Sequence, residues 1–180
     1  MGILQEDAHR LESILEVARK MMLAARTAPK ARGRSNLHML VIYGRELDEL
    51  ARVMNQMGEQ HDNEIFIRDA RNVRDHADAM LIMGTQIQTM GLKLCGLCGF
   101  ESCDEKLEFP GVPCVFNTGD LGIAVGSAVA AAALYHVDNR IMYTAGMAAR
   151  ELKLPVENCP VVYGIPLSAS SKNPFFDRKL

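Results

Sequence analysis

The sequence predicts a mixed α+β fold, in which helices cover a layered sheet and a cysteine-rich loop is inserted between the elements. Three observations lead to this prediction. Apolar residues recur at helical spacing near the N-terminus, several short β-rich runs are apolar throughout, and four of five cysteines lie between Cys95 and Cys114. A chain of 180 residues suits one domain, so we expect a single domain over 1–180 with the cysteine-rich loop at 91–116 inside it.

The N-terminal segment has the spacing of an amphipathic helix that ends before Pro29. Its apolar stripe is formed by Leu4, Ala8, Leu11, Leu15, Ala18, Met22 and Ala25. Residues 45–59 show a similar apolar side, and a shorter helix is expected over 147–152.

Three apolar runs predict strands that are covered on both faces of the sheet. They span residues 37–43, 78–84 and 159–166. The segment 64–68 alternates around Ile65 and Ile67, which fits either a short strand or the entry to a helix.

A long segment rich in small apolar residues begins at Asp120. We expect Asp120 to be an N-cap or first-turn acid of a helix, where a negative charge meets the positive helix end. Gly122, Gly126 and Ala130 lie four residues apart and form a smooth strip for close packing of another helix or a ligand. The apolar run 121–135 is too short for a bilayer span of ~20 residues.

Composition excludes several classes of partner. The formal net charge is −2 and the isoelectric point is near 6.2, so no global charge draws the chain to nucleic acid or to an anionic membrane. The N-terminal dozen residues carry Glu6, Asp7 and Glu12 where a secretory signal needs a basic start and an apolar run. We therefore expect a cytoplasmic protein with no nucleic-acid or membrane partner.

The cysteines carry the strongest chemical signal. Cys95, Cys98, Cys103 and Cys114 have the spacing C-x2-C-x4-C-x10-C, and in a reducing compartment such a cluster favours a metal site or a catalytic thiol over disulfides. Gly96 and Gly99 relax the turn between the first cysteines and leave backbone N–H groups for the sulfurs. Cys159 lies beside an apolar strand and is expected to be a packed core residue.

Two metal centres compete for these four thiolates. Structural zinc usually takes two C-x2-C pairs or adds His ligands, and no His lies between Cys95 and Cys114. Three close cysteines plus a more distant one are typical of iron–sulfur loops, so we favour a [4Fe-4S] cluster. Zinc, or a thiol redox centre without metal, stays open. Acidic residues flank the cysteines and form a solvated rim that could lower a cluster's potential; they are Glu101, Asp104, Glu105 and Glu108.

The run from Cys95 to Cys103 resembles the C-x2-C-G-x3-C signature of four-iron ferredoxin-type domains. Such domains occur in electron-transport complexes and corrinoid iron–sulfur proteins. Their fourth cysteine usually lies further along the chain than Cys114 does, which leaves the nuclearity of the cluster open.

A second resemblance spans most of the chain. Residues 23–43 are similar to the helix, Ala-Pro loop and strand of nitroreductases, 119–137 to their long central helix, and 161–166 to their last core strand. Together these features resemble a prokaryotic family of uncharacterised proteins described as containing a ferredoxin domain. The resemblance implies a nitroreductase-like α+β fold and an intertwined homodimer, which in relatives holds FMN at the subunit interface.

The flavin site departs from the nitroreductase pattern. The usual Arg-rich phosphate-binding segment is missing, and Gly33 stands where relatives have Asn, although Asn36 lies nearby. The resemblance implies that basic residues of the loop and the tail converge on the phosphate, where they would form charge-assisted hydrogen bonds. The candidate flavin residues are Arg26, Lys30, Arg32, Arg34, Asn36, Lys172 and Arg178. Whether FMN binds stays open.

Two functions remain after these observations. The favoured one is an iron–sulfur redox or electron-transfer protein, flavin-linked if FMN binds, whose donor or acceptor protein is unknown. The alternative is a non-enzymatic scaffold or binding protein stabilised by zinc. The sequence does not decide whether the protein is an enzyme.

Overall fold

A four-stranded antiparallel sheet forms the centre of the molecule in the computed structural model, which describes residues 2–156 and 158–176. The strand order is β1-β2-β4-β3, with β1 at Leu37–Tyr43, β2 at Ala79–Thr85, β3 at Asp138–Asn139 and β4 at Val161–Ser168. In the pairing register Leu81 faces Val41 on one side and Ile165 on the other. The three long strands lie within one or two residues of their predicted positions.

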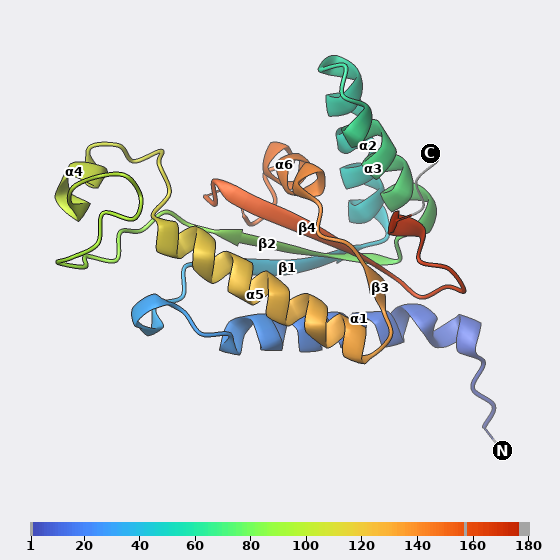
Figure 1. The fold of residues 1–180 in the computed structure, drawn as a ribbon. Helices are drawn as coiled ribbons and strands as arrows, with labels where there is room; N and C mark the ends of the chain where they lie inside the picture. The colour runs from blue at the N-terminus through green and yellow to red at the C-terminus, as the bar shows by residue number, and fades with distance from the viewer. Residues whose placement is uncertain (1, 157, 177–180) are drawn as a thin grey trace.

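Two helical layers cover the sheet (Figure 1). Helices α1 (Glu6–Thr27) and α5 (Val115–Leu134) cover one face, and α2 (Arg45–Gln60), α3 (Glu64–His76) and α6 (Tyr143–Glu151) cover the other. Along β2, Leu81 and Met83 pack with α1 and α5, while Met80 and Ile82 pack with the opposite layer. Because alternate side chains enter two separate cores, all seven residues of β2 are buried, and this explains its continuous apolar run.

Segment 64–68 is the start of α3 and not a strand. The side chain of Asn63 accepts a hydrogen bond from the backbone N–H of Ile65 at 3.0 Å, which caps the helix. The short helix predicted at 147–152 is the second half of α6, which begins four residues earlier at Tyr143.

The buried side of α1 differs from the predicted stripe. Leu4 precedes the helix and is 74% exposed, and Leu11 is 41% exposed. The buried residues are Ile14, Val17, Ala18, Met21 and Ala25. The predicted and the observed apolar stripes share Ala18 and Ala25. In the other turns the residue that packs against α5 and the sheet is one position earlier than predicted, so the larger side chains of the predicted stripe lie at the edge of this contact.

Helix α5 is longer than predicted, because it begins at Val115 and runs for 20 residues. By length and composition alone this helix could cross a membrane, whereas the run 121–135 was expected to be too short to do so. The core helix of a soluble protein meets the same test. One side of α5 packs along α1 and β2.

The segment between β2 and α5, residues 86–114, projects from one end of the sheet (Figure 1). We call it the cysteine lobe. It contains one short helix, α4 (Cys103–Leu107). The cysteine-rich loop was predicted at 91–116, so the lobe begins five residues earlier than predicted, and residues 115 and 116 belong to α5. The end of α1 and the short 3-10 helix η1 (Ala31–Gly33) lie at this same end of the molecule (Figure 1).

Candidate metal and cofactor site

The four clustered cysteines lie on the cysteine lobe as free thiols. Cys95 and Cys98 stand on a turn in which Gly96 and Gly99 have φ values of 70° and 89°, in the left-handed region that favours glycine. Cys103 begins α4, whose N-cap Ser102 accepts a hydrogen bond from the Glu105 N–H at 3.1 Å. The N–H of Gly99 donates to the carbonyl of Gly96 at 3.0 Å, so this group is engaged within the turn and not left for a sulfur.

The four thiols lie in the same lobe, but they are not arranged around a common metal position. Within residues 2–156 and 158–176, no group of three or more His, Cys, Asp or Glu side chains is arranged to hold a metal ion. The donor set itself, four thiols within one short lobe, fits an iron–sulfur cluster or zinc. Metal sites are commonly assembled only when the metal binds, so the four-cysteine ligand set stays a prediction.

Cys114 is the N-cap residue of α5 and is buried, unlike the other three. Its carbonyl accepts a hydrogen bond from the backbone N–H of Asn117 at 2.9 Å. The N-terminal end of a long helix favours negative charge, so an anionic centre at Cys114 is electrostatically matched to α5.

The side chain of Asn117 has a buried N–H donor without a hydrogen-bond partner. The residue is only 1% exposed, and its Oδ1 accepts from the N–H of Gln88 at 2.8 Å. Its Nδ2 is buried and has no hydrogen-bond partner. Buried amide groups are nearly always paired, so this atom indicates a missing acceptor.

Asn36 also has a buried side-chain amide without a partner, and it contacts the segment that follows β2. Its carbonyl accepts from the N–H of Gln86 at 3.0 Å, and its Nδ2 is buried without a partner. Two unpaired amide donors, Asn36 and Asn117, therefore flank segment 86–88. Asn36 is one of the predicted flavin residues and Asn117 is not, because a single Asn among small and apolar residues carries no motif.

Two contacts join the Ala-Pro loop to this region. The backbone N–H of Ala31 donates to both carboxylate oxygens of Asp120, and Arg32 Nη1 donates to the carbonyl of Met90 at 2.8 Å. The prediction that Asp120 begins its helix is wrong, since α5 starts five residues earlier and the carboxylate binds another segment.

Three of the four predicted phosphate-binding cations of the loop are already engaged. Lys30 Nζ donates to the carbonyls of Ala25, Arg26 and Ala28 and so caps the end of α1. Burial lowers the pKa of Lys30, and the neighbouring Arg26 lowers it further. Arg26 donates to Ser35 Oγ, whereas the exposed Arg34 guanidinium has no hydrogen bond or ion pair within the described residues.

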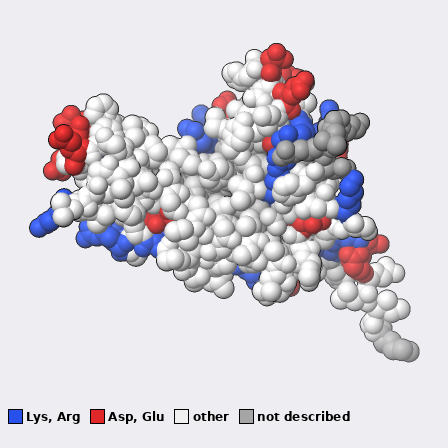
Figure 2. Space-filling model, viewed as in Figure 1, with Lys and Arg blue, Asp and Glu red and all other residues white. Residues whose placement is uncertain are grey.

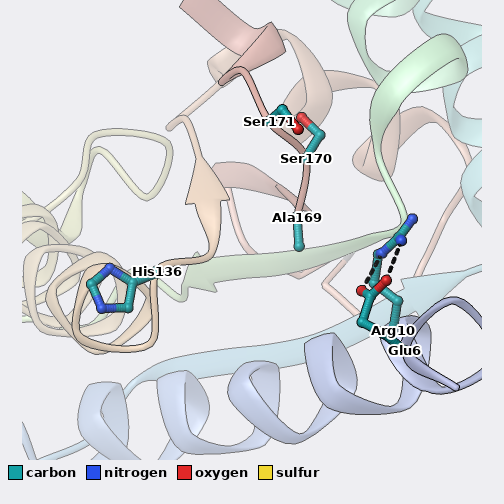
Figure 3. Close-up of a pocket in the computed structure, with 6 residues that line it drawn as sticks. All are labelled: Glu6, Arg10, His136, Ala169, Ser170 and Ser171. Carbon is teal, nitrogen blue, oxygen red and sulfur yellow. Dashed lines mark hydrogen bonds and ion pairs between the residues drawn. The ribbon is translucent and has the colours of Figure 1, made fainter.

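The tail lies at the opposite end of α1 from this loop. Lys172 adjoins Ser170, which lines a pocket of about 520 Å³ with Glu6, Arg10, His136, Ala169 and Ser171. Figure 3 shows the paired Glu6 and Arg10 of that pocket. Arg10 and Arg26 are separated by about 24 Å along the helix axis. Within one copy of the chain, Lys172 therefore lies apart from the loop cations, and their convergence on one phosphate stays a prediction. Arg178 lies outside the described residues.

A second pocket, of about 420 Å³, separates the cysteine lobe from the body of the protein. Its lining includes Gln86, Pro110, Gly111, Arg150 and Asn158. This volume lies within the range of small-molecule sites. Arg150 is a single cation at the end of α6, and nothing in the sequence pattern singled it out.

Cys159 is separate from the lobe and fully buried, as predicted. Burial raises the pKa of its thiol to about 11. A Cβ added to Gly84 would lie 2.8 Å from the Cβ of Cys159, so the small residue in β2 makes room for this side chain.

Comparison with known proteins places this architecture in a family. Residues 110–178 match the family described as "Uncharacterized protein containing a ferredoxin domain (DUF2148)". A protein of Archaeoglobus fulgidus, described as "Uncharacterized protein", is 42% identical over 183 residues, covering 98% of this chain and 97% of that protein. The chain belongs to this ferredoxin-domain family. The matched segment contains Cys114, while the other three clustered cysteines precede it.

Solved structures similar to this member of the ferredoxin-domain family are nitroreductase-family proteins. A nitroreductase family protein from Clostridium novyi has a TM-score of 0.59 at 16% identity, with 86% of this chain and 73% of that chain covered. A BluB-like flavoprotein from Clostridium difficile has the same TM-score at 18% identity, covering 88% and 81%. The FMN-dependent nitroreductase NfnB from Mycobacterium smegmatis, solved with NADPH, also scores 0.59 at 14% identity, covering 87% and 78%. The predicted nitroreductase-like α+β fold is confirmed.

Proposed function

We propose that this protein is an iron–sulfur redox protein whose [4Fe-4S] cluster is held by Cys95, Cys98, Cys103 and Cys114. The ferredoxin-domain family and the nitroreductase-type fold support a redox function. The observation that carries the proposal is the presence of four free thiols within the single lobe of residues 86–114. Cys114 caps α5, and Asn117, whose side-chain Nδ2 is buried and unpaired, lies in the first turn of the same helix.

The chain's own residues define what each part does. The four thiols bind the metal, the left-handed turn at Gly96 and Gly99 sets the approach of the first two, and α5 offers its positive end to the anionic centre. A cluster bound here supplies one-electron transfer, while the protein sets its position and potential. Asp120 and Arg32 hold the Ala-Pro loop against this region.

Among the described residues, a single copy of the chain does not bring the predicted flavin residues together. The amides of Asn36 and Asn117 suit carbonyl oxygens such as those of a flavin ring, but the loop cations and Lys172 lie at opposite ends of α1. We therefore assign no step of the function to a flavin within one chain. A flavin-linked function requires a second copy that brings its tail to this loop.

The exposed side of α5 is the surface we propose for that homodimer. Gly119, Gly122 and Gly126 face open space, with no atom within 4 Å of an added Cβ, and Ile123 is 49% exposed beside them. Apolar helix surface of this kind is stabilised by burial against another helix. We place the protein in the cytoplasm, where free thiols persist, with an unidentified protein as electron donor or acceptor.

Anaerobic purification tests the proposal directly. We expect a brown protein with iron and sulfide bound, measured per chain together with zinc and flavin. Cys98→Ser should lose most of the iron, whereas Cys159→Ala, which removes the fully buried fifth cysteine outside the lobe, should keep it. Stoichiometric zinc in a colourless protein would replace the redox proposal with the zinc-stabilised scaffold, and flavin without iron would indicate a plain flavoprotein.

A further inference from the structure

The pocket between the cysteine lobe and the body of the protein is lined by three side chains that carry N–H donors. Its volume is about 420 Å³. Gln86 belongs to the lobe, whereas Arg150 and Asn158 belong to the body. Within the part of the chain that the structure describes, none of these three side chains has a hydrogen bond or an ion pair. The pocket therefore offers one guanidinium and two amides to a ligand with acceptor oxygens.

Arg150 lies in the last turn of α6, where the negative end of the helix favours a cation. Burial raises the pKa of the neighbouring Cys159 thiol and the Arg150 charge opposes this increase, so the guanidinium lies near that residue. Asn158 and Pro160, which adjoin Cys159 in the chain, both line the pocket. The cation is thus held at the wall that the body contributes.

The charge of Arg150 is not balanced inside the pocket. Among the described residues, the lining includes no Asp or Glu. The adjacent Glu151 lines a different pocket, between α2 and α6. Figure 2 shows the acidic residues of the lobe gathered over α4, at its tip. The lining carries a net positive charge and so suits an anionic ligand.

Ile87 forms an apolar wall of the pocket, and the backbone on each side of it is fixed. The N–H of Gln86 donates to the carbonyl of Asn36 at 3.0 Å. The N–H of Gln88 donates to Oδ1 of Asn117 at 2.8 Å. Because both neighbours of Ile87 are held by distant segments, this wall is formed before any ligand binds.

Two prolines, Pro110 of the lobe and Pro160 of the body, complete the apolar lining. The ring of proline fixes its backbone φ angle, so this surface loses little conformational freedom when a ligand binds. A preformed site with apolar walls and a few polar groups is the usual form of a small-molecule pocket. The apolar walls favour an anion attached to an apolar body over a small inorganic ion.

We propose that this pocket binds a small organic carboxylate, whose anionic group pairs with Arg150 and whose apolar part contacts the isoleucine and proline walls. A planar guanidinium binds a carboxylate through two parallel hydrogen bonds, so the two groups are matched in shape as well as in charge. The amides of Gln86 and Asn158 are further donors to the ligand's oxygens. This inference goes beyond the proposed function and does not depend on a metal at the cysteines.

Three probes test the chemistry of the ligand by isothermal titration calorimetry with the purified protein. Benzoate and benzamide share one shape and differ in charge, and the Kd of benzoate should be about ten-fold lower, as expected for one hydrogen bond to a charged group. Acetate keeps the carboxylate without the ring and should bind at least several-fold more weakly than benzoate. A Kd for benzoate equal to that of either other probe would overturn the inference, as would the absence of benzoate binding.

Two substitutions test whether benzoate occupies this pocket. Arg150→Met should weaken benzoate about ten-fold and leave benzamide unchanged. Arg71→Met, which removes an exposed arginine from α3, is the matched control and should change neither Kd. Gly111→Leu adds a side chain to the pocket lining, and an added Cβ there meets no atom within 4 Å, so the variant should fold and weaken both probes several-fold.

Thermal unfolding shows that each variant is folded before its Kd is compared. Equal effects of Arg150→Met and Arg71→Met, or wild-type benzoate affinity in Gly111→Leu, would refute the assignment to this pocket. Metal analysis of the same samples keeps this inference apart from the proposed function. A brown iron protein that binds no benzoate would refute the pocket and leave the cluster, whereas a metal-free protein that binds benzoate would refute the cluster and leave the pocket.

Discussion

The backbone N–H of Ala31 donates to both carboxylate oxygens of Asp120, at 3.0 and 3.1 Å, and joins two segments that lie 89 residues apart. This contact anchors the Ala-Pro loop to the second turn of α5, six residues after the N-cap Cys114. The same loop reaches the cysteine lobe through Arg32 and Met90. The two candidate cofactor regions are therefore held together by hydrogen bonds to one short loop.

Asp120→Ala should lower the free energy of unfolding by about 1.5–3 kcal/mol, the range for a hydrogen bond to a charged group whose partner is then left unpaired. Urea unfolding of the metal-free protein measures the change. Glu16→Ala, at an exposed position on α1, should change it by no more than about 0.5 kcal/mol. Equal effects of the two substitutions would show that the Ala31 contact adds no stability.

Gly146→Ala should destabilise the protein severely, because the added Cβ would lie 1.9 Å from the carbonyl oxygen of Val162. The neighbour is the backbone of β4 and cannot turn aside, so we expect a loss of about 3 kcal/mol or failure to fold. Gly119→Ala is the control, since its Cβ meets open space within α5. That helical substitution should raise stability by about 0.5–1 kcal/mol. Thermal unfolding of both variants compares them.

Gly126→Leu should weaken self-association, since a large side chain would separate two α5 helices that pack through their exposed glycines. Sedimentation velocity over a range of protein concentrations measures the dimer fraction. Gln60→Leu, which adds the same side chain at an exposed position of α2, should leave the dimer intact. A monomeric wild-type protein, or an intact Gly126→Leu dimer, would contradict the proposed interface.

Cys159 should make stability depend on pH in the alkaline range. Burial raises the pKa of its thiol from an ordinary value of 9.0 to about 11, so the folded state keeps the proton when the unfolded chain has lost it. The contribution is complete below about pH 9 and is lost as pH rises toward about 11. Urea unfolding at pH 8 and pH 10.5 should show a smaller alkaline loss for Cys159→Ala than for the wild type. Identical losses would mean that this thiol does not contribute.

Much of the fold was predictable from local pattern. The runs at 37–43 and 78–84 are apolar without alternation, which is the expected pattern for strands between two helical layers. The helix at the N-terminus was predicted, but its buried side was not, because Leu11 and Ile14 are equally apolar and only contact with α5 selects between them.

The sequence alone determined the chemistry that the protein can hold: the four-thiol donor set, its spacing, and the packed fifth cysteine follow from residue type and order. Only the tertiary structure decided which polar groups are left without partners. The unpaired amides of Asn36 and Asn117 and the separation of Lys172 from the loop cations both arise between distant segments. Burial and hydrogen-bond satisfaction are properties of the packed chain, so no local pattern of residues contains them.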